Sequence, residues 1–221
     1  MARSDQVAGT QRTPPETKAL VLTVGHSTRE QEDFIALLKA HGVKRLVDVR
    51  AIPRSRHNTH FNREQIGPAL RRAGIGHLHM PALGGLRHAQ PSSLNTAWRN
   101  AGFRGFADYM QTPDFAGGLR RLMKLARLKQ TAIMCAEAVS WRCHRSLIAD
   151  ALLAGGYRAE EIESLKCTRQ HALTPWARVQ GTRVTYPSST IPLGKAQKRG
   201  DAPHNNPKTQ LRTRYPSDGT R

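Results

Sequence analysis

The sequence is poor in cysteine, in aromatic residues and in acidic residues. Its 221 residues include three cysteines, and Phe, Trp and Tyr together make up 5%. Three cysteines are too few for a disulfide framework, so we expect a reducing, cytoplasmic location. The apolar runs all fall far short of the ~18 residues that a membrane span needs, and the first residues contain no apolar signal-peptide core. We therefore expect neither a membrane partner nor secretion.

The shortage of acidic residues leaves the chain strongly basic. Lys and Arg number 35 against 16 Asp and Glu, which gives a formal net charge of +19. The excess is found in the body of the chain as well as near its C-terminal end. A charge of this sign favours anionic partners, and we expect a small anionic ligand, with nucleic acid as the alternative. A basic surface that serves solubility alone is equally compatible, and the composition says nothing about oligomeric state.

Composition also divides the chain along its length. Residues 171–221 are rich in Pro, Gly, Ser, Thr and Asn and have few large apolar side chains, so we expect a basic, largely disordered tail. Residues 1–18 are expected to be a flexible N-terminal segment. The remaining residues, 19–170, are long enough for one domain with its own core.

Short apolar runs alternate with helix-like segments between residues 20 and 165. Strands are predicted at 20–24, 45–49, 76–80, 131–135 and near 160–165. This order predicts an α/β fold, a single domain with a mainly parallel sheet of about five strands and helices on both faces. Three helix starts are marked by capping signals at Ser27-x-x-Glu30, Asn62 and Thr112-Pro113, whereas Gly67-Pro68 predicts a kinked or delayed second helix.

In a parallel sheet, ligands bind beyond the carboxyl ends of the strands, and the chemically interesting residues follow the predicted strands. The catalytic candidates are Cys135, Glu137 and His26. The ligand-binding candidates are Ser27, Arg50, Arg54, Ser55, Asn62, Arg142, His144 and Arg145.

Cys135 ends a strand, and a helix start carrying Arg142 and Arg145 follows it. Helix-start amides and arginines attract anions and favour the reactive thiolate. Rhodaneses and cysteine phosphatases use the same order of strand, Cys, loop, Arg and helix, which is an analogy only. The alternative is an inert buried thiol.

The other two catalytic candidates also have two interpretations each. Glu137 is either a general acid/base or a counter-ion to the arginines. His26 is either an acid/base group or a structural residue.

A metal site is another possible use of these residues. Cys135, Cys143 and His144, with His26, offer zinc ligands in principle. Their spacing matches no standard zinc pattern, and Cys143 and His144, as helix neighbours, would point about 100° apart. A redox pair of Cys135 and Cys143 lacks the C-x-x-C arrangement. We therefore expect no metal and no cofactor.

Five segments of the sequence resemble the DUF488 family of uncharacterised bacterial and archaeal proteins. They are TVGHSTR (23–29), LVDVRAIPRSRHNTHFN (46–62), LGG (83–85), WRNAGFRGFADYM (98–110) and MCAEAVSWRCHRSLIADALL (134–153). The resemblance covers roughly residues 20–166 and implies a compact α/β domain and a motif set, without a reaction. Gly67-Pro68 departs from the unbroken helix expected there.

Together these observations favour a cytoplasmic enzyme or binder that acts on a phosphate-bearing or other anionic ligand in a cleft at the carboxyl ends of the strands. The alternative is a non-catalytic nucleic-acid-binding protein that uses the basic body and tail. A third reading is a ligand-sensing domain without turnover.

Overall fold

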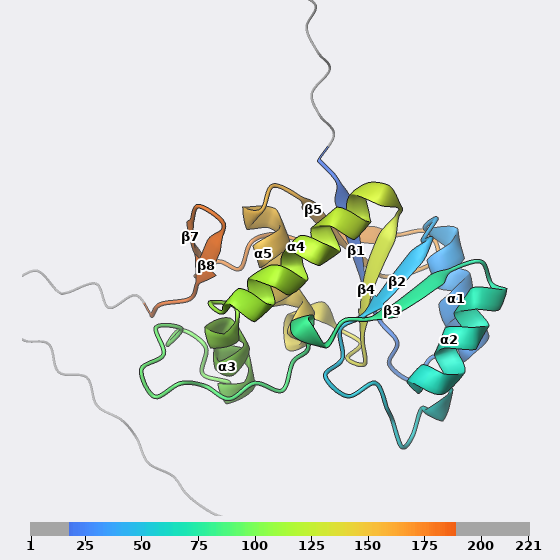
Figure 1. The fold of residues 1–221 in the computed structure, drawn as a ribbon, viewed down its shortest axis with the longest axis horizontal. Coiled ribbons are helices and arrows are strands. Elements are labelled where there is room, and N and C mark those ends of the chain that lie inside the picture. Colours follow the sequence, from blue (N-terminus) through green and yellow to red (C-terminus); the bar gives the residue numbers. More distant parts are fainter. Residues whose placement is uncertain (1–17, 189–221) are drawn as a thin grey trace, which may run out of the picture. The chain divides into compact units, whose positions relative to one another are not determined.

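The computed structural model describes residues 18–188, which form a six-stranded sheet with helices on both faces (Figure 1). The strand order is β3-β2-β4-β1-β5-β6. The first five strands are parallel, and β6 pairs with β5 in the antiparallel direction. The fold prediction is confirmed. The strands are β1 (Leu20–Gly25), β2 (Arg45–Asp48), β3 (Gly76–His79), β4 (Thr131–Cys135), β5 (Arg158–Ile162) and β6 (Thr168–Gln170).

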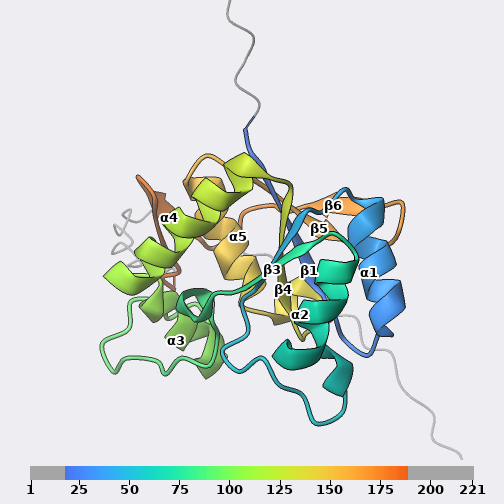
Figure 2. The same cartoon turned by 45° about the vertical axis from the view of Figure 1, so that its right-hand side comes forward.

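The helices divide between the two faces of the sheet (Figures 1 and 2). Helices α1 (Gln31–Ala40) and α2 (Arg63–Arg72) cover one face. Helices α4 (Pro113–Leu128) and α5 (Arg145–Ala154) cover the other, together with α3 (Ala101–Tyr109). Across residues 18–188, no helix is both long enough and apolar enough to cross a bilayer.

Strand β1 shows how the sheet separates two apolar cores. Successive side chains of a strand point to opposite faces. Val21 packs in the core beneath α4 and α5, whereas Leu22 and Val24 pack in the core beneath α1 and α2. Because helices cover both faces of the sheet, the sequence of β1 is a continuous apolar run in which apolar and polar residues do not alternate.

The capping predictions have mixed outcomes. Thr112 caps α4 as expected, because its hydroxyl accepts from the backbone N–H of Phe115 at 3.3 Å. The capping box at Ser27 is wrong. Helix α1 begins at Gln31, and Ser27 lies in the preceding turn with a positive φ of 51°.

Helix α2 also differs from its prediction. Asn62 stands at the cap position, but its side chain accepts from the backbone N–H of Ser55 at 2.7 Å and so closes the loop before the helix. The helix runs through Pro68 as one continuous element. Because proline has no backbone N–H, the helix lacks the hydrogen bond that residue 68 would otherwise donate. The helix still buries one face, which includes Ile66, Ala69 and Leu70.

The predicted boundary of the tail needs correction. Residues 171–188 form part of the domain, with a two-stranded hairpin of β7 (Arg178–Gln180) and β8 (Arg183–Thr185). The segment has few apolar side chains, but Ala177, Val184 and Tyr186 are buried in the core beneath α5. The rest of the predicted tail, 189–221, and residues 1–17 lie outside the described residues.

The buried carboxylate of Asp150, on α5, forms hydrogen bonds with residues 171–188. Asp150 is fully buried and accepts hydrogen bonds from the Tyr186 hydroxyl at 2.8 Å, from the His171 ring at 2.7 Å and from the backbone of Thr174 at 3.0 Å. The Tyr186 ring also packs edge-on against Trp98, 5.5 Å between centroids. Burial and the neighbouring carboxylate raise the pKa of Tyr186, so its hydroxyl stays a donor.

We expect Tyr186→Ala to destabilise the domain by about 3–5 kcal/mol, as removal of a fully buried aromatic ring does. Tyr186→Phe should cost only about 1–2 kcal/mol, because Asp150 keeps its other two partners. Urea unfolding followed by circular dichroism measures both. If Tyr186→Ala unfolds at the wild-type midpoint, residues 171–188 are not part of the core.

Candidate cysteine–histidine centre

The carboxyl ends of β1, β2 and β4 meet at one edge of the sheet. The backbone N–H of His26 donates to the carbonyl of Cys135 at 3.0 Å, and that of Ser27 to Ala136 at 2.9 Å. On the other side of β4, the N–H of Val49 donates to the carbonyl of Met134 at 3.0 Å. Predicted site residues from three distant segments therefore lie on the same edge.

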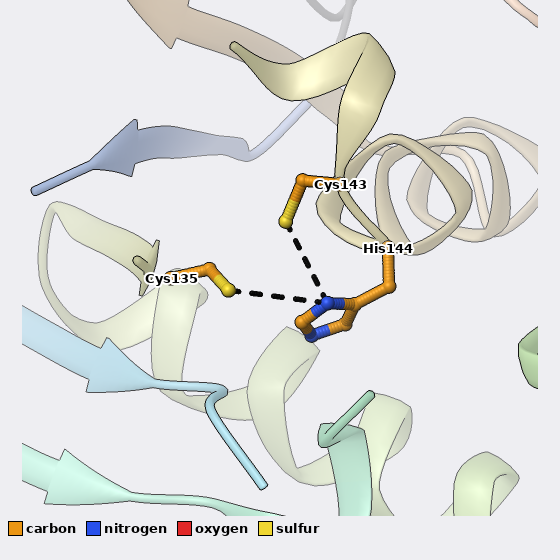
Figure 3. A group of neighbouring side chains, drawn as sticks. All are labelled: Cys135, Cys143 and His144. Atoms are coloured by element: carbon orange, nitrogen blue, oxygen red, sulfur yellow. Dashed lines mark hydrogen bonds between the residues drawn. The ribbon is translucent and has the colours of Figure 1, made fainter. Parts of the chain in front are cut away.

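Two cysteines and one histidine converge at this edge (Figure 3). Cys135 ends β4, and Cys143 and His144 lie between the short 3-10 turn Ser140–Arg142 and α5. His144 Nδ1 lies 3.6 Å from Cys143 Sγ and 4.0 Å from Cys135 Sγ. The three atoms all lie within 4.8 Å of one another. Cys143 is buried, whereas Cys135 and His144 are partly exposed, so the centre is open on one side.

The imidazole of His144 is held by its surroundings. Its Nε2 lies 3.0 Å from the carbonyl oxygen of Val49, which only accepts, so Nε2 carries the proton and Nδ1 presents its lone pair to the sulfurs. Phe106 packs edge-on against the ring at 5.0 Å. Gly85 leaves room beside it, because a Cβ there would lie 3.0 Å from Nδ1.

The pKa values of the two thiols are shifted in opposite directions. A hydrogen bond from Cys135 lowers the pKa of Cys143 well below the ordinary thiol value, and the charge of Arg145 acts in the same direction. The same hydrogen bond, with burial and the neighbouring sulfur charge, raises the pKa of Cys135. The pair therefore loses its first proton readily and its second with difficulty.

Arg145 lies beside this pair and is fully buried. Its Nη2 donates to the carbonyl oxygen of Glu137 at 2.6 Å. Its Nε and Nη1 are also buried and have no hydrogen-bond partner within residues 18–188. Most buried polar atoms in proteins are hydrogen-bonded, so two nitrogens without a partner on a buried cation are unusual.

A second cluster at the same edge is bonded within the protein. The guanidinium of Arg50 is paired with Asp48, donates to the carbonyl of Phe61 at 2.8 Å and lies 3.3 Å from His26 Nε2. His26 stacks on Phe61 with ring centroids 4.1 Å apart, and its Nδ1 donates to the Ser27 carbonyl. Burial lowers the pKa of His26 to about 4, with the Arg50 charge acting in the same direction. Arg50 thus has its donors occupied by the protein itself.

The remaining candidates lie at the periphery. The side chains of Glu137 and Arg142 are exposed, and Arg54 is exposed beside Glu64. Ser55 and Asn62 bond within their own loop. Five surface pockets of the described residues have volumes of about 170–660 Å³, and none of the five is lined by Cys135, Cys143 or His144. The centre therefore lies outside these five pockets, and only the partial exposure of Cys135 and His144 opens it to solvent.

Sequence reasoning considered Cys143 only as a zinc ligand or as a redox partner of Cys135, and one step in the argument against a metal, that Cys143 and His144 are neighbours on a helix, was wrong. Cys143 and His144 precede α5, with Cys143 in an extended conformation (φ −133°, ψ 146°), so their side chains converge. The adjacent Cys-His pair that begins eight residues after another cysteine was the available signal.

Comparison with known proteins places the chain in a family. The sequence model described as "Domain of unknown function DUF488" matches residues 30–152, which is more than half of the chain. Residues 25–27, which contribute to the resemblance noted above, precede the matched segment. Searches of curated proteins and of solved structures gave no match. The cysteine–histidine centre falls within the matched segment, and the chain belongs to the DUF488 family.

Proposed function

We propose that the chain is an enzyme that acts on a small anionic ligand at the cysteine–histidine centre. The observation that carries the proposal is Arg145, a fully buried guanidinium with two unpartnered N–H groups beside the reactive side chains. Arg50 shows the contrast, because a buried carboxylate from Asp48 neutralises it.

A buried charge is costly unless a counter-charge and hydrogen bonds compensate for it. The carbonyl of Glu137 satisfies one nitrogen of Arg145, and the side chain has no carboxylate partner among residues 18–188. A phosphate or carboxylate matches the fork of a guanidinium and supplies the missing charge. Arg145 therefore supports an anionic group as the part of the ligand that this centre recognises.

Backbone strain at the same edge also supports a functional role. Among the described non-glycine residues, only Ser27 (φ 51°) and Leu86 (φ 59°) have positive φ. Leu86 directly follows Gly85, which packs against His144, and its side chain is 78% exposed. Strained conformations persist where the surroundings enforce them, and they cluster at functional sites.

The chemical groups that meet the ligand are sulfur and imidazole nitrogen. Cys135 Sγ is the more exposed sulfur, and His144 Nδ1 is a proton acceptor held 4.0 Å away from it. Sulfur next to a positioned base is a common arrangement for nucleophilic catalysis, and the same atoms also serve as metal ligands.

A thermal-shift screen of the full chain tests the proposal. Phosphate-bearing compounds and small carboxylates at 100-fold over their Kd should stabilise the domain by about 2.7 kcal/mol, which raises Tm by roughly 5–10 °C. Uncharged analogues should give no shift. Arg145→Lys, which keeps the charge but loses the fork, should abolish most of the shift, whereas Arg142→Gln on the exposed neighbour should retain it.

The proposal fails if no anion in the panel shifts Tm, or if the shift is the same in Arg145→Lys as in wild type. Stabilisation by polynucleotides alone, with a steep dependence on salt, would instead support the nucleic-acid-binding alternative.

A further inference from the structure

We infer that Cys135, Cys143 and His144 bind a thiophilic divalent cation, and that zinc is the ion this site fits best. The inference rests on the centre of the proposed function and names the cofactor that would operate there. It depends on the positions of three ligand atoms, on the orientation of the imidazole and on the open side of the cluster.

The distances between the ligand atoms match those around zinc. Zinc bonds of about 2.3 Å to sulfur and 2.0–2.1 Å to nitrogen, in tetrahedral geometry, place sulfur and nitrogen about 3.6 Å apart. His144 Nδ1 lies 3.6 Å and 4.0 Å from the two sulfurs. All three atoms lie within 4.8 Å of one another, so one ion reaches all of them with small side-chain rotations. Two thiolates and an imidazole select zinc over magnesium or calcium.

The imidazole is already oriented as a ligand. Histidines that bind metals usually donate their other ring N–H to a carbonyl or carboxylate, which fixes the tautomer and the ring plane. His144 Nε2 donates to the carbonyl of Val49 at 3.0 Å, so Nδ1 faces the sulfurs with its lone pair. Figure 3 shows the two cysteine side chains approaching that nitrogen from different elements.

Three protein ligands leave one tetrahedral position for another molecule. Structural zinc sites are closed by four protein ligands, whereas catalytic sites keep an open position for water or substrate. Cys135 and His144 are partly exposed while Cys143 is buried, so the open side faces solvent. Arg145 follows two residues after Cys143 and is fully buried. An anionic ligand on the ion would therefore also lie near a guanidinium whose Nε and Nη1 have no partner among residues 18–188.

Metal loading of the tag-free full chain tests the inference. Protein reduced, stripped with a chelator and dialysed against zinc should retain one zinc per chain by elemental analysis. Cobalt in place of zinc should give the intense sulfur-to-cobalt charge-transfer absorption of thiolate ligation. Zinc should protect two of the three cysteines from alkylation, and peptide mapping should find the label on exposed Cys167.

Single variants identify the ligands. Cys135→Ser, Cys143→Ser and His144→Gln should each weaken zinc binding at least 10-fold and change the cobalt spectrum. Cys167→Ser and His57→Gln, on exposed residues of the same types, should bind as wild type does. Circular dichroism of each metal-free variant checks that it is folded.

Substoichiometric zinc, a cobalt spectrum without thiolate charge transfer, or binding that the three ligand variants leave intact would overturn the inference. If zinc does not bind but anions still stabilise the protein through Arg145, the metal assignment fails and the proposed function stands. If zinc binds as expected but no anion stabilises the loaded protein, the proposed function fails and the metal site stands.

Discussion

Gly25→Ala should destabilise the domain by about 3 kcal/mol, the upper part of the usual range for overpacking, and lower its Tm by roughly 6–12 °C. A Cβ on Gly25 would lie 1.9 Å from the carbonyl oxygen of Glu137 and 2.9 Å from that of Ala138. Both contacts are with backbone, which a side-chain rotation cannot relieve. Either the end of β1 or the loop after β4 must move.

The displaced loop is the one that supports the centre. The carbonyl of Glu137 accepts from Arg145, so we expect Gly25→Ala to weaken zinc and anion binding even at temperatures where the variant is folded. Differential scanning fluorimetry gives Tm, and zinc retention gives the effect on the centre.

Gly76→Ala is the matched control, because it adds the same methyl group to another strand. The nearest atom to a Cβ on Gly76 is the carbonyl oxygen of Lys44 at 3.6 Å, an ordinary contact. This variant should unfold within about 0.5–1 kcal/mol of wild type. Equal Tm values for the two variants would show that the β1 end and the loop are not in close contact.

The fold could be predicted because it depends on local patterns. Strands β1 and β4 are apolar runs bounded by turn residues, β2 and β3 are shorter and more polar, and a helix-like segment follows each of the four, so the order predicts a parallel sheet. The boundaries of β4 agree with the predicted range of 131–135. The short β6 and the hairpin of β7 and β8 were missed because strands of three residues carry no periodicity.

The candidate site was predictable only in its location. The rule that ligands bind at the carboxyl ends of parallel strands selected Cys135, and the basic helix start that follows it pointed to His144 and Arg145. It could not tell that Arg50 is neutralised by Asp48, since that depends on which side chains turn inward. It also could not show that Cys143 precedes the helix, because one residue of backbone conformation decides whether its thiol meets the imidazole.

The segment after residue 170 shows another limit of composition. A stretch with few apolar residues was expected to lack order, yet Tyr186 is fully buried and bonds to Asp150. Average composition predicts how much surface a segment can bury. It does not predict that one aromatic ring will fill a space left by another part of the chain.

Asp48→Asn should lower stability by about 3–5 kcal/mol, the cost of removing one partner of a buried ion pair. Asp48 is fully buried and Arg50 is 5% exposed. The carboxylate accepts from the backbone N–H of Arg50 at 3.0 Å and from its Nε at 2.9 Å. Asparagine keeps one acceptor oxygen but leaves the guanidinium without a counter-charge. Chemical denaturation, with linear extrapolation to water, measures the loss.

Glu64→Gln provides the surface control. It removes the charge that faces Arg54 at 3.5 Å, where both side chains are more than half exposed, and such pairs contribute little in water. We expect an unchanged midpoint. A double variant, Asp48→Leu with Arg50→Met, should lose less stability than Asp48→Asn, because it removes both buried charges together.

The ion pair also affects the cysteine–histidine centre, because Val49 lies between Asp48 and Arg50 in the sequence. The carbonyl of Val49 accepts from His144, and the N–H of Val49 bonds to β4. If Asp48 and Arg50 hold this strand end in place, Asp48→Asn should weaken zinc binding as well as stability, whereas Glu64→Gln should change neither. Loss of stability with wild-type zinc affinity would show that β4 alone orients His144. A midpoint equal to that of Glu64→Gln would show that Asp48 and Arg50 are not paired in solution.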